Sequence, residues 1–191
     1  MTGGAKGAML SGGAIIQEEQ KMKPTAIVYT SNTGYTAQYA RMLEERTGWK
    51  AYSLDEAWSA LAENTPVLYL GWLMAGQVKE LKKAQKRFKI CAVCGVCMGR
   101  TGSQLAEVRK ANALPLEMPV FTMQGGFDMK RLHGVYKMMM TIMGKTMGKK
   151  LAQKPDLSPE EREMLRLLNE GGSCVSEENL SGVLAWCREQ K

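Results

Sequence analysis

The chain has 191 residues, of which 45% are hydrophobic and 24% are charged, and these proportions exclude a disordered or fibrous protein. Its five cysteines, three of them within seven residues, do not form the pattern of a secreted disulfide framework, and no apolar run approaches the roughly 20 residues of a membrane-spanning helix. The net charge of +7 favours an acidic partner, an anionic lipid surface or a phosphorylated ligand. We therefore expect a single domain in a reducing cytoplasm.

Residues 1–21 are rich in glycine and small side chains and show no hydrophobic periodicity, so they are expected to form a flexible leader. After them, short apolar runs alternate with segments whose apolar residues recur at helical spacing. The apolar runs predict five strands, at residues 25–30, 49–54, 66–72, 89–96 and 119–126. The intervening segments predict helices at residues 35–48, 55–64, 79–88, 102–112 and 132–151. Gly48 is expected to end the first helix and Asp55 to cap the second.

Strands that alternate with helices are typical of an α/β protein with a parallel sheet and helices on both of its faces. Residues 152–191 predict a C-terminal helical extension packed on this domain, which as a whole is expected to span residues 23–191. The first helix of the extension should be capped by Ser158, with Glu161 completing a capping box, and the second by Ser176.

Polar residues crowd into the segment TSNTGYT, residues 30–36, which joins the first predicted strand to the first predicted helix. Backbone N–H groups at a helix N-terminus bind anions, and hydroxyl donors add to such a site. The alternative is an ordinary helix start with the hydroxyl of Ser31 or Thr33 as its cap. Because ligands of open parallel sheets bind at the carboxyl ends of the strands, the position of this segment favours a phosphate site. The dinucleotide-binding fingerprint G-x-G-x-x-G is missing from it.

The residues Ser31–Thr36, which read SNTGYT, match the pattern T/S-x-T-G-x-T, and with the strand and helix around them they resemble the opening of the flavodoxin family. A second stretch, PVFTMQGGFDMKRLHGVYKMMMTIM at residues 119–143, resembles flavodoxin-domain proteins related to the menaquinone-dependent protoporphyrinogen dehydrogenases. The resemblance covers roughly residues 23–150. It implies a flavodoxin-like, doubly wound sheet of five parallel strands in the order 2-1-3-4-5, with an extra C-terminal helix and with FMN bound noncovalently.

The resemblance also implies which residues hold the FMN. Its phosphate would lie on the first loop, at Ser31, Asn32, Thr33, Gly34, Tyr35 and Thr36. Its isoalloxazine ring would lie between the loop after the third strand, at Gly71, Trp72, Leu73, Met74, Ala75 and Gly76, and the loop after the fourth, at Cys97, Met98 and Gly99. Trp72 has a flat side chain suited to stacking on a flavin, and edge packing within the fold is the alternative.

Three cysteines lie at the spacing C-x-x-C-x-x-C, in CAVCGVC at residues 91–97, as in proteins that bind an iron–sulfur cluster. A four-cysteine cluster needs another thiolate, and the next cysteine along the chain is Cys174. Side chains alternate between the faces of a strand, so Cys91 and Cys94 are expected to fill opposite, covered faces of the fourth strand. No metal site is therefore expected, and Cys97, at the end of that strand, is kept as a candidate for the flavin site.

Two segments, residues 79–89 and 129–150, carry much of the positive charge. The second is rich in methionine, and it predicts either a helix that lies on a membrane surface or an amphipathic helix whose methionine row packs on the sheet. His133, the single histidine, is either an acid–base group near a substrate or a surface residue at the start of this helix. Nucleic acid is not an expected partner, because the basic residues lie on helices behind the sheet and no nucleic-acid-binding motif is found.

The function expected from these features is electron transfer by an FMN-binding, flavodoxin-like redox protein with a redox partner protein. The alternative is an FMN-dependent enzyme of the protoporphyrinogen-dehydrogenase type, with a porphyrin-type substrate and a quinone that takes the electrons. The net charge of +7 fits this alternative better than docking to the usual flavodoxin reductases, because familiar flavodoxins are acidic. A second alternative is a cofactor-free binding or regulatory module on the same fold.

Overall fold

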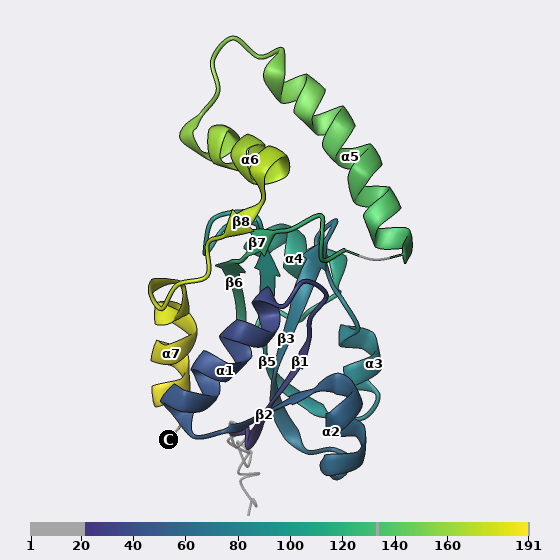
Figure 1. The fold of residues 1–191 in the computed structure, drawn as a ribbon. Coiled ribbons are helices and arrows are strands. Elements are labelled where there is room, and N and C mark those ends of the chain that lie inside the picture. The colour runs from purple at the N-terminus through teal and green to yellow at the C-terminus, as the bar shows by residue number, and fades with distance from the viewer. Residues whose placement is uncertain (1–21, 133, 191) are drawn as a thin grey trace, which may run out of the picture.

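The computed structural model describes residues 22–132 and 134–190, so the leader expected at residues 1–21 and the two expectations for His133 lie outside the described residues. For residues 143, 147, 148 and 150–152 it describes the backbone alone. The strands are β1 (Ala26–Thr30), β2 (Lys50–Ser53), β3 (Pro66–Met74), β4 (Gln77–Val78), β5 (Lys89–Cys97), β6 (Val120–Gln124), β7 (Gly126–Phe127) and β8 (Gly172–Ser173). The helices are α1 (Tyr35–Thr47), α2 (Leu54–Ala60), α3 (Leu81–Gln85), α4 (Leu105–Ala111), α5 (Gly134–Ala152), α6 (Pro159–Glu170), the 3₁₀ helix η1 (Glu178–Leu180) and α7 (Ser181–Arg188) (Figure 1).

Five parallel strands form the central sheet in the order β2-β1-β3-β5-β6. Because β5 and β6 are the fourth and fifth parallel strands of the chain, this is the order 2-1-3-4-5, and the predicted flavodoxin-like doubly wound fold is confirmed. β1 pairs with β2 on one side and with β3 on the other. The carboxyl ends of β1 and β3 therefore mark the point where the strand order reverses, which is where such sheets bind ligands.

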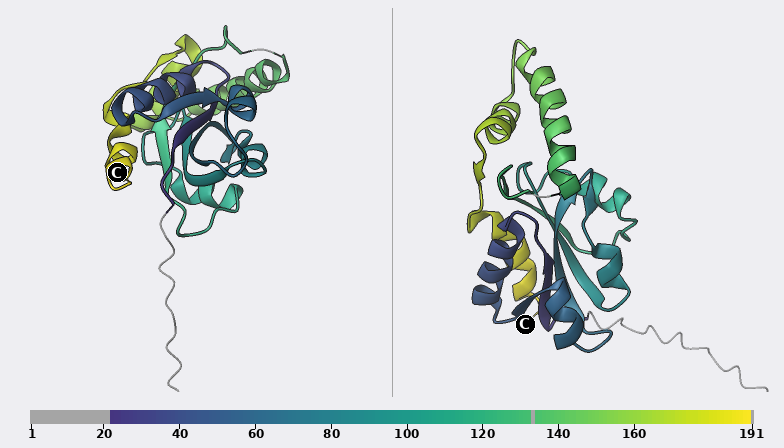
Figure 2. Two further views of the ribbon diagram at one scale, coloured as in Figure 1. Left: turned by 90° about the horizontal axis from the view of Figure 1, so that it is seen from below. Right: turned by 45° about the vertical axis from the view of Figure 1, so that its right-hand side comes forward.

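Helices cover both faces of the sheet, and each face has its own apolar core (Figure 2). α1 and α7 pack on one face, where Tyr39, Leu43 and Trp186 are buried. α2, α3 and α4 pack on the other face, with Leu81 and Val108 among the buried residues. Because both faces are covered, the inner strands are nearly continuous apolar runs, which is why they could be predicted.

The first two helices begin and end at local signals. Gly48 ends α1 in the left-handed region, at φ 79°, as expected. α2 is capped by Ser53, whose hydroxyl accepts a hydrogen bond from the Glu56 N–H. The Glu56 carboxylate in turn accepts a hydrogen bond from the Ser53 N–H. Asp55, expected as the cap, instead lies in the first turn, because the Ser53–Glu56 capping box starts the helix two residues earlier.

β3 is longer than predicted and folds back on itself. It continues to Met74, and β4 pairs with its end in antiparallel orientation. The two turn residues, Ala75 and Gly76, have φ values of 50° and 76°. Positive φ at both positions is the geometry of a type I′ hairpin turn, whose twist matches that of the flanking strands. Residues 71–77, expected to be an open loop, are therefore the end of a strand and a tight hairpin.

α5 and α6 form a helical hairpin that projects beyond the carboxyl ends of the strands (Figures 1 and 2). α6 begins with the expected capping box of Ser158 and Glu161. The chain returns to the sheet through β8, which pairs with β7, and then through η1 to α7, so Ser176 is not the cap of the last helix. The methionine-rich α5 thus lies beyond the edge of the sheet and not on its face. Within the described residues, no helix is both long enough and apolar enough to cross a membrane.

Candidate functional site

The loop between β1 and α1 presents hydrogen-bond donors at the point where the strand order reverses. Its backbone turns at Gly34, the N-cap of α1, whose φ of 95° is a conformation that glycine adopts without strain. The Gly34 N–H donates to the Ser31 hydroxyl oxygen (3.1 Å), a bond within the loop. Among the described residues no side chain caps α1, so neither Ser31 nor Thr33 has the capping role that was the alternative. The first N–H groups of this 13-residue helix are therefore available to an anion.

Arg131 brings positive charge to this loop from the segment after β7. Its Nη1 donates to the Thr33 carbonyl (3.3 Å) and lies 3.5 Å from the position that a Cβ would take at Gly34. Its Nε forms an ion pair with Asp128 Oδ2 (3.2 Å), which orients the guanidinium. In the same loop, Asn32 Nδ2 is buried and has no hydrogen-bond partner among the described residues. A guanidinium, an unsatisfied amide donor and free helix N–H groups form a donor set that suits a phosphate.

Tyr35 and Thr36 begin α1 with buried side chains. The Tyr35 hydroxyl donates to the Gly172 carbonyl (3.0 Å), and burial raises the pKa of this phenol. Its ring lies close to Gly126, where a Cβ would be 2.7 Å from the ring. Tyr35 therefore joins the start of α1 to the β7–β8 pair, and this close packing explains the glycine at position 126.

The residues expected to bind the ring after the third strand lie in β3 itself and in its hairpin. A Cβ at Gly71 would be 2.6 Å from Val78 Cγ1, so glycine is required there by packing. The Trp72 carbonyl accepts a hydrogen bond from the Lys79 N–H (3.0 Å), and residues Leu73–Met74 pair with β4. These backbone groups are used within β3 and its hairpin, and the binding of a flavin ring by residues 71–76 stays a prediction.

Trp72 packs against the start of α5. Its ring meets that of Tyr136 edge to face, with the centroids 5.1 Å apart and the planes at 88°. Lys79 Nζ lies 5.4 Å from the Trp72 centroid and 5.1 Å from the Tyr136 centroid, so the ammonium group contacts both rings. Trp72 thus has the edge-packing role, and stacking on a flavin stays a prediction.

The hairpin turn at Ala75 and Gly76 lies next to α4. The Asn112 side chain fixes the turn, because it donates to the Gly76 carbonyl (2.9 Å) and accepts from the Val78 N–H (3.0 Å). A groove of about 580 Å³ lies here, lined by Ala75, Gly76, Gln104, Glu107, Lys110 and Ala111. The hairpin turn is therefore held beside α4, on the opposite face of the sheet from α1.

Cys97, Met98 and Gly99 lie at and beyond the carboxyl end of β5. The Cys97 carbonyl accepts a hydrogen bond from the Gly125 N–H (2.7 Å), and burial raises the pKa of its thiol. Met98 belongs to an apolar cluster, called here the edge cluster, whose buried members are Phe127, Leu132 and Leu167. The edge cluster joins the loop after β5 to the α5–α6 hairpin.

A β-bulge corrects the expected orientation of the other cysteines in β5. The register between β3 and β5 shifts after Val67, so Cys91 is an extra residue in the ladder. Cys91 and Cys94 consequently pack on the same face, with α1 and α7, and not on opposite faces. None of the five cysteines forms a disulfide, and in the part of the chain that the structure describes no group of three or more His, Cys, Asp or Glu residues could hold a metal ion.

Two residues at this edge were not expected from the sequence. Arg131 is 98 positions from Thr33 in the chain, and no local pattern connects a basic residue after the fifth strand with the first loop. Asn179 donates to the Tyr39 hydroxyl (2.7 Å) and to the Cys174 carbonyl (2.8 Å), so it holds the returning chain against α1. An asparagine in a segment of turn residues gives no signal for such a role.

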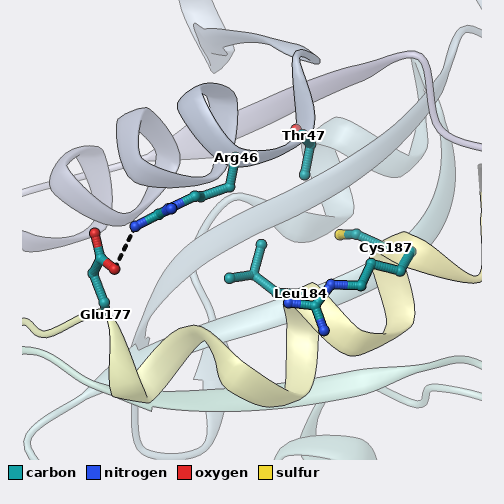
Figure 3. A pocket seen from close by; sticks show the side chains of 6 residues that line it. Arg46, Thr47, Glu177, Leu184 and Cys187 are labelled. Carbon is teal, nitrogen blue, oxygen red and sulfur yellow. Dashed lines mark hydrogen bonds and ion pairs between the residues drawn. The ribbon is translucent and has the colours of Figure 1, made fainter.

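A separate pocket of about 280 Å³ lies between α1 and α7 (Figure 3). It is lined by Arg46, Thr47, Glu177, Leu184, Cys187 and Arg188. Figure 3 shows the ion pair between Arg46 and Glu177 (2.5 Å), which joins α1 to the segment before α7. None of the residues expected to bind a cofactor lines this pocket, so it is distinct from the candidate site.

No protein-family model and no curated protein sequence matches this chain. The order of the strands therefore carries the fold assignment by itself. The family indicated by the SNTGYT segment stays a prediction.

Proposed function

We propose that this protein binds FMN and carries electrons to and from a redox partner protein in the cytoplasm. The observation that carries the proposal is the donor set at the β1/β3 switch point, formed by the uncapped N-terminus of α1, the loop 31–34 and the Arg131 guanidinium. Flavodoxins, whose sheet has the order 2-1-3-4-5, bind FMN at this point. The SNTGYT segment at the same loop is the pattern of the family that the sequence resembles.

The donor set fits the phosphate of FMN. The N-terminus of α1 carries a partial positive charge, and the hydroxyls of Ser31 and Thr33 flank it. Asn32 Nδ2 would gain the hydrogen-bond partner that it lacks. Arg131 is already oriented by Asp128, so little freedom is lost when its guanidinium binds the phosphate oxygens.

The flavin supplies the redox chemistry, and the chain would hold its ring at the carboxyl edge of the sheet. Trp72, Tyr136 and Met98 offer aromatic and thioether surfaces there, which suit a flat, polarisable ring. The Cys97 thiol keeps its proton at neutral pH because burial raises its pKa, so it is a neutral group and not a thiolate.

A second candidate is an enzyme of the protoporphyrinogen-dehydrogenase type that passes electrons to a quinone. The net charge of +7 favours a carboxylate-bearing substrate such as a porphyrin. The exposed apolar side chains of α5, close to the carboxyl edge, favour a lipid-soluble acceptor. The two candidates are separated by supplying the reduced protein with a soluble quinone or with a redox protein and measuring which one reoxidises it.

FMN binding to the full-length protein, followed by the quenching of FMN fluorescence, tests the proposal, with riboflavin as the matched ligand that lacks the phosphate. We expect FMN to bind at least about tenfold more tightly than riboflavin, because a charge-assisted hydrogen bond contributes about 1.5–3 kcal/mol. Arg131→Ala should weaken FMN binding about tenfold and leave riboflavin binding unchanged. Lys130→Ala removes the neighbouring exposed charge and is the control, expected to change neither affinity by more than about twofold.

Equal affinities for FMN and riboflavin would contradict a phosphate site on the loop 31–36. An equal loss of both affinities in Arg131→Ala would mean that Arg131 acts through the fold, which thermal unfolding of the variant would show independently. A folded protein that takes up neither ligand would favour the cofactor-free binding or regulatory module.

A further inference from the structure

The outer side of α5 carries a stripe of exposed apolar side chains. Val135, Met138, Met139 and Ile142 are 57%, 60%, 43% and 60% exposed. Their spacing of three, one and three residues places all four on one side of the helix. These four residues are called the α5 stripe here. The helix that carries them is about 28 Å long, at 1.5 Å per residue.

The other side of α5 is already occupied. Tyr136 and Met140 pack against the edge cluster, and a Cβ at Gly144 would be 4.0 Å from Leu168 of α6. α5 is therefore apolar on two sides but has a protein neighbour on one. Exposed apolar patches normally mark an interaction site, and the α5 stripe has no partner within the described fold.

The segment that carries the α5 stripe is rich in positive charge and has no negative charge. Between Asp128 and Asp156 the sequence has seven lysines and arginines and no acidic residue. Three of the lysines, Lys137, Lys145 and Lys149, are exposed on α5 and make no ion pair with any described residue. The acidic side chains of α6 are different, because Glu161 and Glu163 are paired with basic neighbours.

We propose that α5 docks the protein on the surface of a bilayer that contains anionic phospholipid, with the α5 stripe in the interface and the lysines at the headgroups. Charge complementarity selects this occupant, since an apolar side flanked by lysine is what an anionic interface binds. Two copies packed stripe to stripe would instead bring two sets of lysines together, which disfavours self-association. Docking would place the carboxyl edge of the sheet, where Tyr136 contacts Trp72, close to the lipid.

Co-sedimentation of the full-length protein with phospholipid vesicles tests this docking. The protein should bind vesicles of phosphatidylcholine that contain phosphatidylglycerol, bind phosphatidylcholine alone far more weakly, and dissociate at high salt. Replacing Lys137, Lys145 and Lys149 together by Gln should weaken partitioning about 100-fold, since each lysine near an anionic surface contributes about fivefold. The double variant Met138→Gln, Ile142→Gln should weaken it about tenfold or more, because two apolar side chains no longer enter the interface.

Leu116→Gln is the matched control, because Leu116 is 82% exposed in the loop before β6, away from α5. It should bind vesicles as the wild type does. Far-UV circular dichroism of each variant checks that the fold is kept, which is expected because every substituted side chain is exposed. Unchanged vesicle binding in the folded Gln variants of α5 would overturn the proposal. A wild-type dimer that the Met138→Gln, Ile142→Gln variant abolishes would overturn it too, in favour of a second copy. Vesicle binding needs no flavin, so its failure would leave the proposed FMN site untouched.

Discussion

Asn179→Ala should lower the free energy of unfolding by about 2 kcal/mol, because its side chain holds the carboxyl edge together through four hydrogen bonds. Its Nδ2 donates to the Tyr39 hydroxyl (2.7 Å), to the Cys174 carbonyl (2.8 Å) and, at a longer distance, to the Gln124 carbonyl (3.3 Å). Its Oδ1 accepts from the Thr101 hydroxyl (2.6 Å). Each bond contributes at most about 1 kcal/mol net to the stability of the fold. In the variant, water that reaches the site forms new hydrogen bonds with the remaining partners and so replaces part of this contribution. For a chain of this size, about 2 kcal/mol corresponds to a fall in Tm of about 4–8 °C.

Thermal and urea unfolding followed by circular dichroism measure this loss. Asn169→Ala is the control, because Asn169 is exposed on α6, and its replacement should change stability by less than about 0.5 kcal/mol. If the two variants unfold at the same temperature and urea concentration, the Asn179 network does not hold the edge together and the reasoning is wrong.

Two further predictions concern a glycine and a thiol. Gly126→Ala should destabilise the protein by about 2–4 kcal/mol, because the new Cβ would clash with the Gly172 carbonyl oxygen and break the β7–β8 pair. Gly144→Ala is the control and should be neutral or stabilising, because the helix has room for a Cβ there and alanine favours the helix more than glycine does. Urea unfolding compares them, and an equal effect of both would contradict the close packing at Gly126. Burial raises the pKa of the Cys91 thiol to about 11 from 9.0, so the unfolded chain loses this proton first and stability should fall as pH rises from about 9 to about 11. Urea midpoints measured across that range should fall less steeply in Cys91→Ala, and an identical slope would contradict the burial of this thiol.

Most of the sheet could be predicted because its strands are buried on both faces and read as apolar runs between turn residues. The hairpin after β3 could not, since residues 71–74 continue the apolar run. Its turn also uses Ala75 at φ 50°, where the usual signal would be asparagine or glycine. The face of Cys91 was predicted wrongly for a different reason, because a bulge breaks the two-residue alternation on which the prediction relied.

The candidate site was predicted in part. The loop 31–36 follows from sequence because its signal is local, a polar segment between a strand and a helix. Arg131 could not be found this way, since its contact with Thr33 depends on the path of the chain through five strands. The bounds of α5 were predicted closely, at 132–151 against 134–152, but helical spacing does not reveal which of two apolar sides is covered.

Uptake of FMN by the purified full-length protein tests the central claim most directly. The account predicts a yellow protein, or a colourless one that takes up one equivalent of added FMN and shows the absorbance bands of a bound flavin. It also predicts that inorganic phosphate competes with FMN, because both would occupy the N-terminus of α1 beside Arg131. A folded protein that stays colourless after incubation with FMN would contradict the account.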